Sequence, residues 1–297
     1  GQRKMDYIYG VIAVICIEII ATVGLAVFTG FTGLFSLGHA AFMAIGAYTS
    51  AILTHFYHVP FVLALLGGTL MSAAVSVILG FPTLRAKLRG DYFAIATLGF
   101  GEAVRVILEN LSITQGARGL PGLTHYTTLS VAAVFAVIVV WATRNFIWSK
   151  YGRNAIAVRE DAVAAEMAGI DLLKVRMLSL TYSAACGGLA GGLFAHYLNF
   201  IQPAMFTSIL STQLTSAVVA GGMGSITGPV LAIALFIAVP EVLRVANMWR
   251  LVAYGLILVL IMIFRPSGIL GYHELSFEGI KKLFTRKAKE SAGERSI

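Results

Sequence analysis

The sequence has 297 residues, of which 58% are hydrophobic and only 12% are charged. Soluble domains carry about 25% charged residues, so this composition excludes an ordinary soluble protein and indicates one that lies in the membrane. The net charge is +8, but the basic residues lie in short connections and near the C-terminus, which argues against nucleic acid as a partner and is typical of loops that face anionic membrane lipid.

Apolar runs long enough to cross a hydrocarbon core of about 30 Å follow one another along the chain. The fold class is therefore predicted to be all-α, a polytopic transmembrane helical bundle over residues 1–271, with a basic cytoplasmic tail at 272–297. The predicted spans lie at about residues 7–28, 43–53, 61–81, 92–108, 128–148, 177–199, 209–220, 230–243 and 251–264.

The basic connections predict the orientation of the bundle. Three segments are basic: the connections 84–90 and 149–176 and the C-terminal tail. The number of spans between them allows all three to lie on one side of the membrane, with connections 109–127 and 200–208 on the other. The positive-inside rule assigns the basic group, and with it the C-terminus, to the cytoplasm.

The N-terminus conflicts with this count. Counting back from the basic connections puts it outside, whereas Arg3 and Lys4 favour the inside. Either a further helix precedes Gly1 and has been lost, which we favour, or residues 29–38 re-enter the membrane without crossing it.

Two glycine-rich segments interrupt the apolar runs, GLFSLGHAA at 33–41 and GGMGSITGP at 221–229. Non-helical backbone at membrane depth is tolerated only where it is buried in protein or lines a wet cavity, and transporters often contain broken helices at matching positions. Close helix packing through small residues is the alternative explanation. We expect broken helices that line a translocation pathway, with Ser36, Gly38, His39, Gly221, Gly222, Gly224 and Ser225 as candidates.

Ionisable residues also lie within or near the apolar runs, at Glu18, Glu102, Arg105 and Glu241. Such groups are unfavourable in lipid and usually face a bundle interior, a cavity or an interface. Glu102 and Arg105 are three residues apart, so they share a helical face and are placed to pair. A structural ion pair is favoured over a contact with solute, and both residues are kept as candidates for the pathway.

The longest polar connection between spans, 149–176, predicts a short amphipathic cytoplasmic helix over 159–168. Its alanines favour helix, Gly169 follows as a stop, and acidic residues near the start suit the helix dipole. Such a helix can sit in a groove of a motor subunit and transmit a rigid push to the spans, although an ordinary surface helix stays open. The candidate coupling residues are Gly152, Arg153, Arg159, Glu160, Asp161, Ala164, Ala165 and Gly169.

This connection resembles the coupling loop of ABC-importer permeases, whose pattern is Glu-Ala-Ala, three residues, then Gly. Here Val163 stands in place of the Glu, before Ala164, Ala165 and Gly169. The runs SLGHAAFMAIGAY, DYFAIATLGFGEAVR, GRNAIAVREDAVAAEMAGID, AGGLFAHYLNFIQP, GGMGSITGPV and FRPSGILG are similar to branched-chain amino acid permeases of the type called LivM. The resemblance covers about residues 7–271. Gln115 and Gln213 depart from it, at positions where Gly and Glu are expected.

The resemblance implies a non-catalytic permease subunit that translocates branched-chain amino acids across the bacterial inner membrane. It implies a second permease subunit of the type called LivH, two ATP-binding cassette ATPase subunits that use ATP and Mg, and an extracytoplasmic solute-binding protein. The chain itself has no G-x-x-x-x-G-K-[ST] motif, so no cofactor is expected on it. No metal site is expected either, because the histidines are scattered and the two cysteines lie in apolar segments.

Three other functions compete with that of a branched-chain amino acid permease. Permeases for urea and short amides look similar and stay open. An ion-coupled secondary carrier would favour several carboxylates at the bilayer midplane, and few are present. A membrane-embedded enzyme would need clustered catalytic or metal-binding side chains, and no H-E-x-x-H spacing occurs.

Overall fold

The computed structural model describes residues 2–86, 90–242, 255 and 268. The predicted all-α class is confirmed, because nearly all of the described chain is helical and the strands are two residues long. The helices are α1 (Gln2–Leu25), α2 (His39–His55), α3 (Phe61–Arg85), α4 (Gly90–Asn110), α5 (Leu129–Trp148), α6 (Lys150–Glu160), α7 (Ala162–Met167), α8 (Leu172–Leu198), α9 (Ser208–Gly221) and α10 (Thr227–Val242). The expected ninth span at 251–264 and the tail at 272–297 lie outside the described residues.

Five stretches of the described chain are helical, long and apolar enough to cross a membrane. α4 has sufficient length but is not among them, since it carries several charged residues along its course. The five stretches are Met5–Gly30, Phe61–Arg85, Leu129–Trp148, Leu172–Leu198 and Pro203–Gly221.

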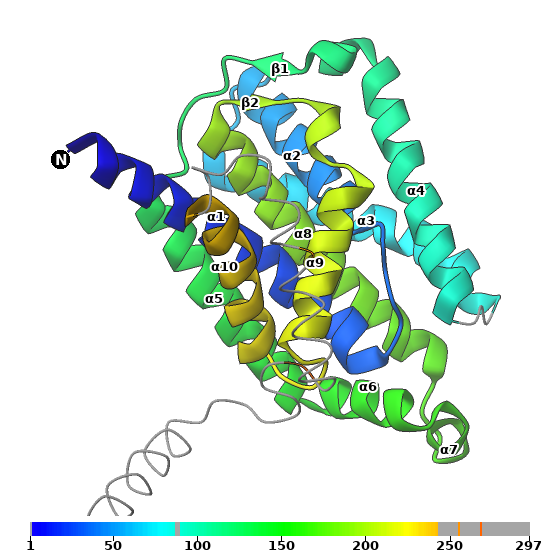
Figure 1. Cartoon of the computed structure of the whole chain (residues 1–297). Coiled ribbons are helices and arrows are strands. Elements are labelled where there is room, and N and C mark those ends of the chain that lie inside the picture. The colour runs from blue at the N-terminus through cyan, green and yellow to red at the C-terminus, as the bar shows by residue number, and fades with distance from the viewer. Residues whose placement is uncertain (1, 87–89, 243–254, 256–267, 269–297) are drawn as a thin grey trace, which may run out of the picture.

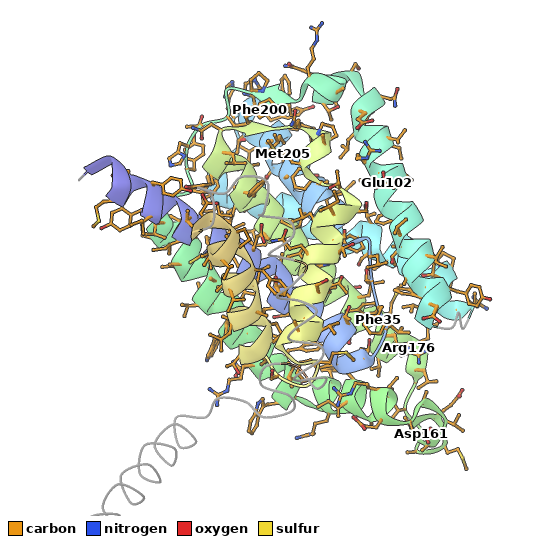
Figure 2. All side chains as sticks on the ribbon, viewed as in Figure 1. Phe35, Glu102, Asp161, Arg176, Phe200 and Met205 are labelled. Atoms are coloured by element: carbon orange, nitrogen blue, oxygen red, sulfur yellow. The ribbon has the colours of Figure 1, made fainter. Side chains whose placement is uncertain are left out.

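The bundle has two distinct ends (Figure 1). At one end, strands β1 (Leu120–Pro121) and β2 (Phe200–Ile201) pair antiparallel, and at the other lie α6 and α7. Figure 2 shows the same separation in side chains, with Phe200 and Met205 far from Asp161. The predicted grouping of connections 109–127 and 200–208 is therefore confirmed, because each contributes one strand to the same pair.

α8 is the central helix of the bundle and packs against α1, α2 and α3. Small residues allow this close approach: a side chain on Gly191 would overlap the carbonyl oxygen of Met43, and one on Gly46 would overlap the backbone of Gly188. In membranes, helices associate through such small-residue contacts because lipid offers no hydrophobic contrast. Close packing through glycine, the alternative explanation for the two glycine-rich breaks, occurs at these positions and also within the breaks, at Gly38 and Gly221.

α1 and α2 run in opposite directions, joined by a partly buried non-helical segment. α1 begins beside His125 and Asn199 at the β1–β2 end and ends beside α6. α2 finishes back at the β1–β2 end, where Thr54 lies 2.9 Å from His196. The alternative in which residues 29–38 re-enter without crossing is therefore wrong, because the helix that follows them continues to the opposite end.

Candidate functional site

The first break lies between α1 and α2. α1 continues as a π-helical turn, Ala26–Gly30, and the chain leaves helical geometry at Gly33, whose φ of +75° favours glycine. Residues 33–38 then run without regular structure until His39 begins α2. The expected break is confirmed here, and half of its residues, Leu34, Ser36 and Gly38, are buried.

Hydroxyl groups from two other helices satisfy the backbone of this break. The N–H of Leu37 donates to Thr97 Oγ1 of α4 at 3.0 Å, and the hydroxyl of Thr215 of α9 donates to the carbonyl of Ser36 at 2.9 Å. The N–H of Ala40 donates to Ser211 Oγ at 2.9 Å. Each such group left unpaired in the interior would cost about 1–3 kcal/mol, so these contacts allow the helix to be interrupted inside the bundle.

Sequence reasoning missed these hydroxyl residues on α4 and α9. A signal was present for two of them: Ser211 and Thr215 are four residues apart in an apolar span, which places both on one helical face. Thr97 has no comparable neighbour and is recognisable only from the structure.

The three candidate residues of the first break lie together in the interior. Ser36 and His39 are each 1% exposed, and Ser36 Oγ and His39 Nε2 have no hydrogen-bond partner among the described residues. A side chain at Gly38 would overlap the carbonyl of Thr97, so α4 crosses the break at this glycine. The segment therefore presents two buried polar atoms at a place where helices approach closely.

The second break lies between α9 and α10, at the α6–α7 end. Gly222 has a φ of +118°, which a residue with a side chain rarely adopts, and Gly221 packs directly on the backbone of Gly228. The hydroxyl of Ser225 is fully buried and accepts a hydrogen bond from the N–H of Gly228 at 3.2 Å. Ser225 thus holds the first turn of α10, while Gly224 is half-buried beside it.

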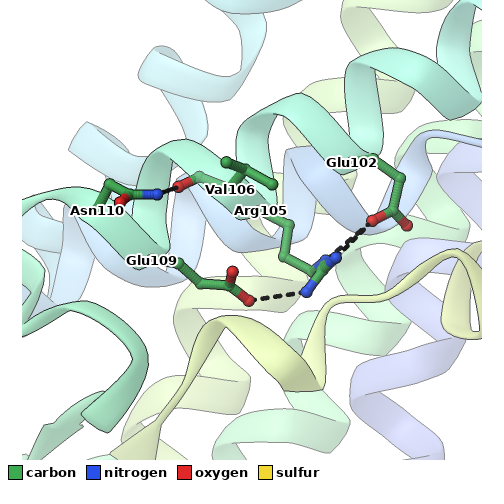
Figure 3. Close-up of polar contacts among 5 residues, drawn as sticks. All are labelled: Glu102, Arg105, Val106, Glu109 and Asn110. Carbon is green, nitrogen blue, oxygen red and sulfur yellow. Dashed lines mark hydrogen bonds and ion pairs between the residues drawn. The ribbon is translucent and has the colours of Figure 1, made fainter.

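Glu102 and Arg105 form the predicted ion pair, within a larger group on α4 (Figure 3). The guanidinium of Arg105 lies 2.9 Å from Glu102 and 2.8 Å from Glu109, which the sequence reasoning had not included. All three side chains are partly exposed and belong to one helix. The structure therefore places Glu102 and Arg105 together on α4, the helix that also meets the first break at Thr97.

The predicted single helix at 159–168 is wrong, because the chain bends at Asp161. α6 ends at Glu160, and α7 begins after Asp161, whose backbone is extended. The Asp161 carboxylate accepts hydrogen bonds from the N–H groups of Val163 and Ala164 at 2.9 and 3.0 Å, so it caps a new helix. Glu160 therefore closes one helix, and only Asp161 lies at the start of another.

The expected stop at Gly169 is confirmed. Gly169 has a φ of +84°, its N–H donates to the carbonyl of Glu166, and the N–H of Ile170 donates to that of Ala165. This pair of bonds is the Schellman arrangement, and its usual apolar contact is present because Ile170 and Ala165 share a cluster. α7 is thus capped at both ends despite its six residues.

α6 and α7 are built into the bundle by their inner faces. Ala165 is 5% exposed, and it belongs with Val158 to an apolar cluster that includes residues of α1, α5, α8 and the second break. A side chain at Gly152 would overlap the backbone of Ile147, so α6 folds tightly against the end of α5. The outer faces are open: Arg153 and Ala164 are exposed, and Met167 is 86% exposed.

Arg159 differs from the other candidate coupling residues because its side chain points inward. Its side chain is only 13% exposed, and Nη1 donates to the carbonyl of Gly30 at 3.0 Å and to that of Met223 at 3.3 Å. Nη2 lies 2.6 Å from the carboxylate of the exposed Glu160. The bend between α6 and α7 is therefore connected to both breaks through one guanidinium.

A cavity of about 1110 Å³ lies along α1, α9 and α10. It brings together Glu18, Gln213 and Glu241, which are distant in sequence, and none of the expected pathway residues lines it. Oε2 of Glu18 is buried and has no hydrogen-bond partner in the part of the chain that the structure describes. Apolar side chains form much of the rest of the wall, including Val11, Val14, Ile209, Phe236 and Ile237.

Comparison with known proteins agrees with this architecture. The family model described as "Branched-chain amino acid transport system / permease component" matches residues 7–264. The permease protein LivM of the high-affinity branched-chain amino acid transport system is 36% identical in Salmonella typhimurium and in Escherichia coli, over 86% of this chain and 68% of each relative. The probable LivM of Methanocaldococcus jannaschii is 26% identical, over 70% of this chain and 68% of its own.

No solved structure shows significant similarity to this chain. The family match covers most of the sequence, and the apolar helices are those of a multi-pass membrane protein. The chain therefore belongs to the family of permease components of branched-chain amino acid transport systems.

Proposed function

We propose that this chain is the permease subunit of an ATP-binding cassette importer that carries leucine, isoleucine and valine across the bacterial inner membrane. It forms the pathway with a second permease subunit of the LivH type. Two ATPase subunits supply the energy by using ATP and Mg, and an extracytoplasmic solute-binding protein delivers the solute. The relatives that carry a branched-chain amino acid name support the choice of solute.

The observation that carries this proposal is the exposed corner formed by α6 and α7. Val163 and Met167 are 69% and 86% exposed, whereas Ala165 on the other side of α7 is packed into the bundle. A rigid, doubly capped helix with an open apolar face is suited to dock in a groove of an ATPase. Its fixed inner face would pass the movement of that ATPase to the spans.

The charge distribution supports a cytoplasmic position for this corner. Lys150, Arg153 and Lys174 are exposed at the α6–α7 end, and the positive-inside rule assigns such residues to the cytoplasm. The β1–β2 end then faces outward, where a solute-binding protein docks. The predicted cytoplasmic C-terminus lies beyond the described residues and rests on the sequence alone.

The cavity along α1, α9 and α10 supports a solute with an aliphatic side chain. Its apolar wall suits a branched side chain, and the Glu18 carboxylate suits an ammonium group. Urea offers neither feature, and short amides have no ammonium group. Uptake of labelled leucine and labelled urea by cells that express the whole importer separates the two classes, and we expect leucine uptake alone to depend on this chain.

Site-specific crosslinking tests the docking of α7. A Met167→Cys variant in the assembled importer should crosslink to an ATPase subunit, whereas Ala117→Cys, at the β1–β2 end, should not. Both positions are exposed, so accessibility is matched. An assembly that transports leucine but gives no crosslink from position 167 would exclude the proposed docking.

A further inference from the structure

Arg159 lies where the exposed corner meets the interior of the bundle. It precedes the bend at Asp161 by two residues, and the neighbouring Glu160 side chain is 65% exposed while that of Arg159 is 13% exposed. Movement of α7 about the bend must therefore act on Arg159 before it reaches any other inward-facing polar side chain of α6. The position is that of a joint between a surface element and the core.

The two carbonyl groups that Arg159 binds are available because helices end there. Gly30 closes the π-helical turn after α1, and Met223 follows the last residues of α9. Carbonyls at helix ends have no partner within the helix and need a donor from elsewhere. A guanidinium carries several N–H groups in a fixed fork, so it can bind two carbonyls and a carboxylate together, which the single ammonium of lysine does less well.

The two breaks also touch each other beneath this guanidinium. A side chain on Gly30 would approach the carbonyl oxygen of Met223 to 2.7 Å, and one on Gly33 would approach Arg159 Cγ to 3.0 Å. Glycine at both positions therefore allows the first break, the second break and the arginine to lie in direct contact. None of these contacts follows from the sequence, since residues 30, 159 and 223 belong to three separate segments.

We infer that Arg159 is a positioning residue that clamps the two interrupted helices to each other and to the coupling corner. It does not face the ATPase subunits. While Arg159 holds the carbonyls of Gly30 and Met223, displacement of α7 moves both breaks as one unit. Each ATP hydrolysis is then used to move solute. This inference deepens the proposed function and rests on it for the direction of the motion.

The test compares Arg159→Gln, Arg159→Lys and Lys150→Gln in the complete importer, reconstituted in liposomes with its partner subunits. Lys150 is an exposed cation on the same helix, so Lys150→Gln matches the change of charge without touching a break. The measured quantity is labelled leucine taken up per ATP hydrolysed. We expect at least a tenfold loss for Arg159→Gln, an intermediate loss for Arg159→Lys and no change for Lys150→Gln.

A purely structural role would lower the amount of assembled importer, and leave leucine per ATP unchanged in what assembles. The clamp would therefore be overturned if the Arg159→Gln importer takes up leucine per ATP hydrolysed at a ratio within twofold of the unaltered importer. If Arg159→Gln fails to assemble, unaltered coupling in Arg159→Lys would overturn it equally. Crosslinking from Met167→Cys to an ATPase subunit is measured in the same experiments. If no crosslink forms but the arginine variants still take up less leucine per ATP, the docking of α7 is rejected and the clamp is retained.

Discussion

At the scale of single residues, backbone contact at glycine determines how closely the central helices pack. Gly191 of α8 lies against the carbonyl oxygen of Met43 in α2, and Gly188 lies against the carbonyl oxygen of Gly68 in α3. These contacts involve backbone, which cannot move aside as a flexible side chain can. α8 therefore needs glycine at these positions because a side chain would not fit. In the breaks, by contrast, glycine is needed because it can adopt a positive φ angle.

A single methyl group at Gly191 is expected to be destabilising. Gly191→Ala forces α2 and α8 apart, and overpacking of this kind lowers the free energy of unfolding by about 1–3 kcal/mol. The measurement is SDS-induced unfolding of the purified protein in mixed micelles. Gly99→Ala is the control, because no atom of the described residues lies within 4 Å of the added carbon and alanine favours helix. Equal stability of the two variants would contradict the packing role.

At the scale of elements, α7 is a short helix that depends on caps at both ends and on the packing of one face. Six residues are too few for an isolated helix to be stable in water. Its stability comes from the Asp161 cap, the Gly169 stop and the burial of Ala165. The exposed corner formed by α6 and α7 is thus a local structure that loss of one cap can weaken.

Asp161→Ala is expected to loosen α7 without affecting membrane insertion. Loss of an N-cap costs about 1 kcal/mol, so the amides of residues 162–168 should exchange with deuterium about fivefold faster. Asp161→Asn retains a capping oxygen and should leave exchange nearly unchanged. Leucine uptake should fall in the alanine variant and persist in the asparagine variant. Unchanged exchange in Asp161→Ala would show that packing alone holds the helix.

The sequence predicted elements far better than the contacts between them. Within the described residues, the helices at the apolar runs, the two glycine-rich breaks, the stop at Gly169 and the pairing of Glu102 with Arg105 all depend on neighbours in the chain, and all are confirmed. The bend at Asp161 was missed because the acidic residue was interpreted through the helix dipole and not as a cap. The inward position of Arg159 depends on residues 30 and 223, and no local pattern indicates it.

At the scale of the whole molecule, the two ends of the bundle differ in shape and in charge. Strands β1 and β2 join the connections at one end, and α6 and α7 form a projecting corner at the other, beside the exposed cations Lys150, Arg153 and Lys174 (Figures 1 and 2). The core between them is interrupted at two depths: the first break is held between α4 and α9, and the second lies beside α6. Force applied at the corner therefore meets the second break and the end of α1 before it reaches the buried polar atoms of Ser36 and His39.

This arrangement makes the orientation of the molecule a testable prediction. Ala117→Cys and Met167→Cys are placed separately in a chain in which Cys16 and Cys186 are replaced by alanine, and spheroplasts are treated with a membrane-impermeant maleimide. Because the positive-inside rule assigns the α6–α7 end to the cytoplasm, the Ala117→Cys chain should be labelled in intact spheroplasts. The Met167→Cys chain should be labelled only after permeabilisation. The chain without cysteine reports background labelling, and the reverse order of labelling would place the coupling corner outside and remove the basis for its contact with an ATPase.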